Sequence, residues 1–157
     1  MEILFLLIGQ TSEDYLKQGM EIYQSRIRHY IKFDVKEVRL NKKELKKDPE
    51  EQKKAEGSAL LKQIKTTDFV ILLDEHGQEY TSKKFAAFLQ KKMNAGKKRI
   101  VFVVGGAYGF DKQITERANA EIALSRMTFP HQLIRLLFLE QLYRAFTILK
   151  GEPYHNE

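Results

Sequence analysis

Five short apolar runs, separated by stretches with helical periodicity, set the hydrophobic pattern of this chain. The runs predict strands at residues 3–8, 33–40, 68–73, 99–104 and 121–124. Most of them are continuously apolar rather than alternating, which is typical of strands covered on both faces in a parallel sheet. The alternation of strands with helices therefore predicts an α/β fold built on a parallel sheet.

The stretches between the strands carry helix start and stop signals. Thr11 or Ser12 can cap the first helix, Asp48 and Pro49 start the second, and Thr81 or Ser82 caps the third. The predicted helices cover residues 12–30, 48–65, 82–95, 111–118 and 131–149. A lysine-rich connection at residues 41–48 is either a solvated turn or a phosphate-binding loop.

The last predicted helix, residues 131–149, is apolar nearly all round its axis. Such a helix must be covered on every side, and one sheet covers only one of them. A small domain has little else to offer, so this helix predicts a homodimer built partly upon it.

Composition narrows the class of protein. The 157 residues, 43% of them hydrophobic, suit one folded domain spanning residues 1–157. The absence of cysteine excludes disulfides and thiolate chemistry, and no apolar run approaches the ~20 residues of a membrane span. A net charge of +6 favours attraction to a polyanion, although charge alone leaves nucleic-acid binding open.

Three strand ends mark a candidate ligand site, because ligands of parallel α/β sheets bind beyond the carboxyl ends of the strands. These ends are Leu73, Gly105 and Leu124. The run Gly105-Gly106-x-x-Gly109 matches neither a dinucleotide fingerprint nor a phosphate loop, but two glycines allow a flat ligand to approach the backbone closely. A tight turn with no further role is the alternative.

Other residues near these ends could carry chemistry. The loop at residues 125–130 offers hydroxyls, a methionine and an aromatic ring, and is either a pocket for an adenosine-like ligand or an ordinary connector. His131 at the start of the last helix is a cap or a functional group. Arg135 and Arg144 call for anionic partners in so apolar a helix, and the spacing of the four histidines argues against a metal site.

Four motifs, taken in order and spacing, resemble a known family. They are V-V-G-G at residues 103–106, S-R-M-T-F-P-H-Q at 125–132, E-Q-L-Y-R-A-F at 140–146, and P-Y-H at 153–155. Together with the opening strand and Glu56-Gly57, they are similar over essentially the whole chain to the ribosomal RNA large subunit methyltransferase H family, which belongs to the SPOUT class.

The resemblance implies an α/β knot, in which the C-terminal segment forms a trefoil and S-adenosylmethionine binds in the knotted region. It implies N3-methylation of a pseudouridine in helix 69 of 23S ribosomal RNA, on the assembled ribosome, by a cytoplasmic homodimer. Neither DNA nor a membrane is an expected partner. The implied cofactor residues are Leu73, Gly105, Leu124, Ser125, Arg126, Met127, Thr128 and Phe129. The implied catalytic residues are Arg144, Tyr154 and His155, with His131 and Arg135 supporting the substrate.

One departure from the family concerns the C-terminal tail, which ends Asn156-Glu157 where family members often carry a basic residue after the histidine. A contact between tail and RNA phosphate is therefore in doubt. Two alternatives remain open at this stage: a SPOUT-type methyltransferase acting on tRNA, and a non-catalytic protein that binds the ribosome through its basic surface.

Overall fold

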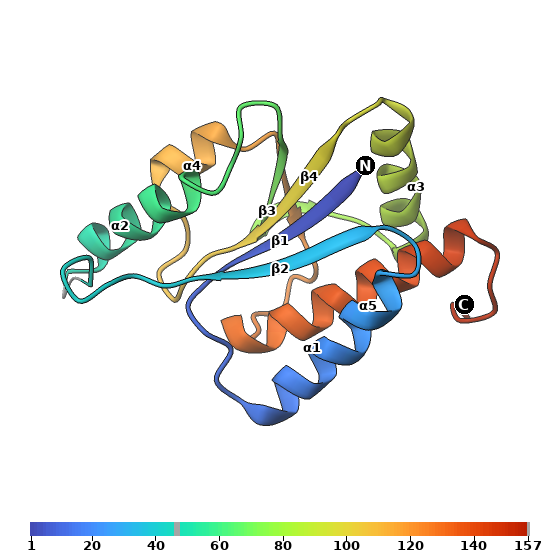
Figure 1. The fold of residues 1–157 in the computed structure, drawn as a ribbon, viewed down its shortest axis with the longest axis horizontal. Helices are drawn as coiled ribbons and strands as arrows, with labels where there is room; N and C mark the ends of the chain where they lie inside the picture. The colour runs from blue at the N-terminus through green and yellow to red at the C-terminus, as the bar shows by residue number, and fades with distance from the viewer. Residues whose placement is uncertain (46–47, 157) are drawn as a thin grey trace.

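The computed structural model describes residues 1–45 and 48–156, and Figure 1 shows a sheet with helices on both faces. The strands are β1 (Glu2–Ile8), β2 (Lys32–Val38), β3 (Phe69–Glu79), β4 (Arg99–Val104) and β5 (Ala120–Ala123). The helices are α1 (Asp14–Ile27), α2 (Pro49–Leu61), α3 (Ser82–Asn94), α4 (Lys112–Arg117) and α5 (His131–Leu149). The predicted α/β class is confirmed.

The five strands are all parallel and lie in the order β2-β1-β4-β3-β5. The central strands are buried on both faces because their side chains point alternately to two separate cores. Ile3, Phe5 and Leu7 of β1 face the core shared with α1, α3 and α5, whereas Leu4 and Leu6 face the core shared with α2 and α4.

Helix α5 lies on the sheet between α1 and α3, with which it makes its main helix contacts (Figure 1). Phe138 at its centre packs against Phe5 of β1 and Phe102 of β4, with ring centroids 4.7 Å apart in each pair. Much of the apolar surface of α5 is thus covered within the chain. A partner subunit is therefore no longer needed to cover most of this helix. The homodimer stays a prediction.

The sheet order brings the three predicted strand ends together. In the register of neighbouring strands, Leu73 lies beside Val104 on one side and beside Ile122 on the other. The turn at Gly105 and the loop after Leu124 therefore leave the sheet at one edge, next to the end of the apolar part of β3.

Several predicted boundaries were wrong. The third strand was predicted to end at residue 73, but β3 continues to Glu79 after a register shift between Leu73 and Gln78. Gly77 allows this, because a Cβ there would lie only 2.6 Å from the backbone of β5. The expected caps Thr11 and Ser12 are also wrong, because α1 begins after Glu13. Asp48 and Pro49 do start α2 as predicted, although the Asp48 side chain makes no cap hydrogen bond.

Other boundaries hold or move slightly. Thr81 caps α3 through its side chain, as predicted. The fourth helix was predicted to start at residue 111, and Asp111 is the N-cap of α4, with its side chain accepting from the Gln113 N–H. The second helix ends at Leu61 rather than 65, and β2 ends at Val38 rather than 40. The predicted lysine-rich connection includes residues 46–47, which lie outside the described residues, as does residue 157.

Candidate active site

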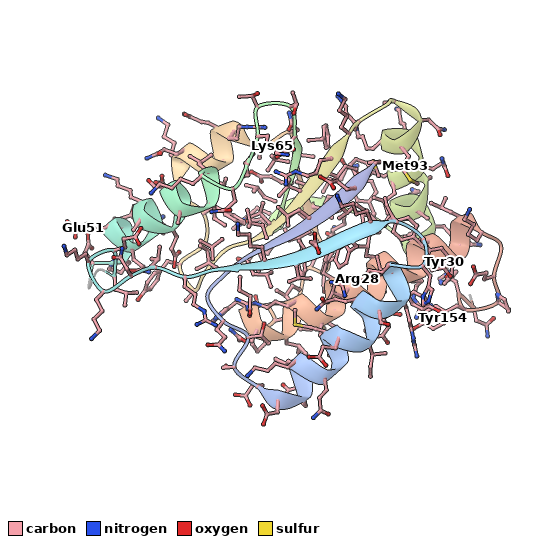
Figure 2. The ribbon with its side chains drawn as sticks, viewed as in Figure 1. Arg28, Tyr30, Glu51, Lys65, Met93 and Tyr154 are labelled. Carbon is pink, nitrogen blue, oxygen red and sulfur yellow. The ribbon has the colours of Figure 1, made fainter. Side chains whose placement is uncertain are left out.

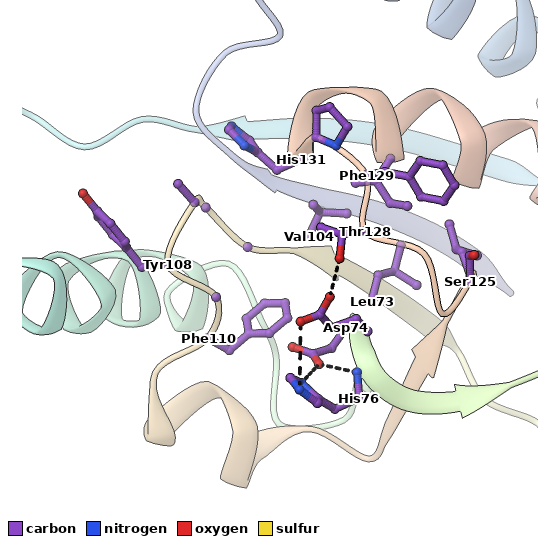
Figure 3. Close-up of a pocket in the computed structure, with 18 of the residues that line it drawn as sticks. Leu73, Asp74, His76, Val104, Tyr108, Phe110, Ser125, Thr128, Phe129 and His131 are labelled. Carbon is purple, nitrogen blue, oxygen red and sulfur yellow. Dashed lines mark hydrogen bonds and ion pairs between the residues drawn. The ribbon is translucent and has the colours of Figure 1, made fainter.

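A cavity of about 530 Å³ opens at the carboxyl edge of the sheet (Figure 3). That volume lies within the roughly 300–1,000 Å³ typical of small-molecule sites. Its lining residues come from the ends of β3, β4 and β5 and the start of α5: Leu73 to His76, Val104 to Phe110, Ile122, Leu124, Ser125, Met127 to His131, and Ile134.

Most of the predicted cofactor residues line this cavity. Leu73, Gly105, Leu124, Ser125, Met127, Thr128 and Phe129 all do so, and His131 stands at the same cavity. Arg126 does not line it, since its exposed side chain forms an ion pair with Glu79 at 2.6 Å.

The glycine turn forms one wall of the cavity. Gly109 has a φ of +84°, which favours glycine, and its N–H donates to the carbonyl of Gly106 at 3.2 Å. A Cβ at Gly105 would meet the Phe110 ring at 3.1 Å and the Gly109 carbonyl at 3.2 Å. The turn therefore closes tightly on itself and holds Phe110 at the cavity.

Sequence reasoning missed an acidic side of the cavity, formed by Asp74, Glu75 and His76. Asp74 Oδ1 lies 2.9 Å from His76 Nδ1, and the Thr128 hydroxyl donates to Glu75 at 3.3 Å (Figure 3). In the sequence, these residues could have been found from their position directly after the apolar run at residues 68–73. The bond from Thr128 to Glu75 ties the middle of β3 to the loop that follows β5.

His131 and Arg135 occupy the first turns of α5 but lie in different surroundings. The pKa of His131 is lowered by desolvation and by the positive charge of Arg135, which favours a neutral imidazole at the cavity. The Arg135 side chain is 0% exposed and donates to the carbonyls of Ile8, at 2.6 Å, and Gly9, at 3.0 Å.

Arg135 also donates to the Thr11 hydroxyl at 2.8 Å and has Glu37 at 3.5 Å. The anionic partner expected for this arginine is thus present. In this arrangement Arg135 connects the start of α5 to the end of β1. It does not line the cavity, whereas His131, one turn earlier in α5, does.

The three predicted catalytic residues form a second cluster at the C-terminal end of α5. Arg144 donates to Glu140 through Nε at 3.0 Å and Nη2 at 2.5 Å, and its Nη1 lies 3.2 Å from His155 Nδ1. The Tyr154 hydroxyl donates to the same Glu140 oxygen at 3.2 Å, and the Arg144 guanidinium lies 4.7 Å from the Tyr154 ring centre. The hydrogen bonds to Glu140 raise the pKa of Arg144 and keep it charged.

The C-terminal tail folds back on α1 and α5 rather than extending from the domain. The rings of Tyr154 and Tyr143 lie 4.7 Å apart, and the Tyr30 hydroxyl donates to Glu152 at 2.7 Å; Figure 2 shows Tyr30 and Tyr154 at this end of the molecule. Burial is the main cause that raises the pKa of Tyr154, so the phenol stays protonated.

The cavity and this tail cluster lie at opposite ends of α5. The thirteen helical steps from His131 to Arg144 span about 20 Å of helix, and the C-terminus lies beyond the end of α5 that is far from the cavity (Figure 1). Within one chain, the predicted cofactor residues and the predicted catalytic residues are not brought together.

Comparison with known proteins identifies the family. Residues 1–155 match the family model described as "Predicted SPOUT methyltransferase". Proteins named "Ribosomal RNA large subunit methyltransferase H" are similar over the full chain, with 49% identity over 160 residues in Porphyromonas gingivalis, covering all of both chains. The protein of that name from Christiangramia forsetii is 47% identical over 156 residues, 99% of each chain. The chain therefore belongs to the SPOUT methyltransferases, and within them to the ribosomal RNA large subunit methyltransferase H family.

Proposed function

We propose that this methyltransferase transfers a methyl group from S-adenosylmethionine to N3 of a pseudouridine in helix 69 of 23S ribosomal RNA. The proposed substrate is the assembled ribosome in the cytoplasm. The names of the relatives support ribosomal RNA as the substrate, and the sequence motifs support the finer assignment. The observation that carries the chemistry is the cavity between the glycine turn and the loop at residues 124–129.

The cavity suits the proposed cofactor in both shape and charge. Apolar walls from Leu73 and Leu124 and the Phe110 ring can enclose an adenine, and the turn at Gly105 offers backbone groups for hydrogen bonds. The acidic side at residues 74–75 can face the positive groups of the methyl donor. When bound, the cofactor supplies an activated methyl group, so the protein mainly has to align the reacting atoms.

His131 at the cavity and the residues of the tail cluster can act on the acceptor base. N3 of pseudouridine must lose its proton to attack, and a neutral imidazole, either His131 or His155, can accept it. Arg144 can stabilise the negative charge that develops on the base oxygens, and Tyr154 can stack on or hydrogen-bond the base. Arg135 supports the site indirectly by fixing the start of α5.

The separation of the two clusters leads us to propose a homodimer in which each cavity works with the tail of the partner subunit. Helix α1 carries two exposed apolar side chains, Tyr15 and Ile22, which are consistent with a contact between subunits at this helix. We expect a dimer in analytical ultracentrifugation at micromolar concentration, and a monomer would contradict the proposal.

The proposed single domain at residues 1–157 and the trefoil knot are consistent with the parallel sheet and its crossovers.

Among residues 1–45 and 48–156, no helix combines the length and apolar character that a membrane crossing requires.

The test of the proposed function is methyl transfer from labelled S-adenosylmethionine to whole ribosomes, separate subunits and tRNA from cells that lack this protein. Mass mapping of the product then locates the modified nucleotide. Label on a single large-subunit pseudouridine, with whole ribosomes preferred, is the expected result. Label on tRNA would overturn the substrate, and no label on any of them would favour a protein that binds ribosomes without catalysis.

A further inference from the structure

A buried carboxyl group lies beneath the glycine turn of the cavity. It belongs to Glu56 in α2, which is 6% exposed. A Cβ built on Gly106 would sit 2.6 Å from Glu56 Oε2 and 2.9 Å from Oε1. The wall of the cavity thus rests directly on this carboxyl group, although Glu56 itself does not line the cavity.

A side chain at residue 106 would first meet the carboxyl group of Glu56. Gly109, in the same turn, has a positive φ, but Gly106 does not. The φ of residue 106 is therefore compatible with an L side chain, and the three atoms nearest to an added Cβ all belong to the Glu56 carboxyl group. The neighbouring Gly57 is close-packed in the same way, because a Cβ there would lie 3.1 Å from Asp111, the cap of α4. Helix α2 therefore contacts the chain both within the turn and directly after it.

The surroundings of Glu56 are unusual for a buried acid. Gln52 donates to Oε2 at 3.2 Å, while Oε1 has no hydrogen-bond partner among the described residues. No ion pair to Glu56 is found in that part of the chain either. Burial accordingly raises the pKa of Glu56. Because a buried, incompletely satisfied carboxyl group costs folding free energy, its presence here points to a role other than stability.

We propose that Glu56 is a positioning residue for methyl transfer: its carboxyl group sets the position of the turn at residues 105–109 and thereby the shape of the cofactor wall. The ligand's identity rests on the proposed function. The position of the turn does not, since it follows from the contact between Glu56 and Gly106. This makes two independent measurements possible.

The first experiment compares Glu56→Gln and Glu56→Leu with the wild-type protein. Calorimetry gives the dissociation constant of S-adenosylhomocysteine, and hydrogen exchange reports the backbone N–H groups of residues 105–109. Gln keeps the shape of the side chain, so binding should stay within about threefold. Leu removes the polar support, so binding should weaken by about tenfold or more and exchange in the turn should accelerate.

The matched control is Glu51→Leu, the same change at an exposed position of the same helix (Figure 2). It should leave both measurements unchanged. If Glu56→Leu does not fold, Glu56→Asp replaces it, because it withdraws the carboxyl group by one carbon. Wild-type binding and wild-type exchange in the Leu or Asp variant would overturn the proposal.

A double-mutant cycle tests the contact itself. Gly106→Ala adds a methyl group against Glu56, whereas in a Glu56→Ala background the methyl group has room. The loss of binding caused by Gly106→Ala should therefore be smaller by about fivefold or more in the Glu56→Ala background. Equal losses in the two backgrounds would overturn the proposal. If the wild-type protein binds no S-adenosylhomocysteine, the proposed cofactor is wrong, and hydrogen exchange in the same four proteins still decides the role of Glu56.

Discussion

Activity restored by mixing two inactive variants would test whether the active site is shared between subunits. The first variant, Gly105→Val, damages the cavity: its side chain begins 3.1 Å from the Phe110 ring, so the turn and the ring must move. The second variant lacks residues 153–157 and therefore lacks Tyr154 and His155. Each variant alone should bind ribosomes but fail to methylate them.

The activity expected of the mixture follows from the distance between the cavity and the tail cluster within one chain. About 20 Å of helix separates His131 at the cavity from Arg144 at the tail cluster, so a tail cannot serve the cavity of its own subunit in the described arrangement. In a mixed dimer, the intact cavity of the truncated subunit meets the intact tail of the Gly105→Val subunit. With random pairing at equal amounts, about half of the dimers are mixed and each has one complete site, so activity per subunit should reach about a quarter of wild type.

The assay is labelled methyl transfer to ribosomes after the two variants have been unfolded and refolded together. Native mass spectrometry confirms that mixed dimers are present, and each variant refolded alone is the control. The mixture should gain activity while both controls stay inactive. Mixed dimers without activity would refute the shared site. Tyr154 and His155 would then have only a structural role within their own subunit.

Two further predictions concern stability. Arg135→Met should lower the free energy of unfolding by about 3–5 kcal/mol, because it leaves the carbonyls of Ile8 and Gly9 unpaired; a change below about 1 kcal/mol in urea denaturation would contradict this. Burial would raise the pKa of Asp68, but hydrogen bonds from Arg99 and the Lys65 N–H outweigh it and lower the pKa below its usual 3.8. Since the folded-state pKa is depressed, Asp68 stabilises the fold above its usual pKa and loses this effect as the pH falls through the lowered value. The stability difference between wild type and Asp68→Asn should therefore shrink between pH 7 and about pH 3, and a constant difference in urea unfolding would contradict the assignment.

The fold class could be predicted because the sequence pattern reflects burial on two faces. The runs in β1, β3 and β4 are continuously apolar since alternate side chains enter different cores. The extension of β3 to Glu79 could not be predicted this way. It depends on the close approach of Gly77 to β5, a contact between segments far apart in the sequence.

The candidate site also has a part that the sequence could predict and a part that it could not. Residues at or directly after the ends of the predicted strands, such as Leu73, Gly105 and Leu124, were found because strand ends meet at one edge of a parallel sheet. The role of Glu56 could not be found, because its contact with Gly106 joins a helix to a turn on another part of the chain. The distance between His131 and Arg144 was available from helix length alone, yet motif matching treated them as one site.

The same helix that separates the two clusters can also join them between subunits. In a two-fold symmetric dimer whose axis passes beside the middle of α5, perpendicular to the helix, the α5 helices of the two subunits run antiparallel to each other. The end that carries His131 then lies toward the partner's Arg144 and tail. A tail folded against its own subunit, through Tyr30 in the turn after α1 and Tyr143 in α5, would already hold its shape before it meets the other cavity. On this reasoning the contacts of Tyr154 within its own subunit prepare the tail for the partner, which is why the mixing experiment distinguishes a shared site from a purely structural tail.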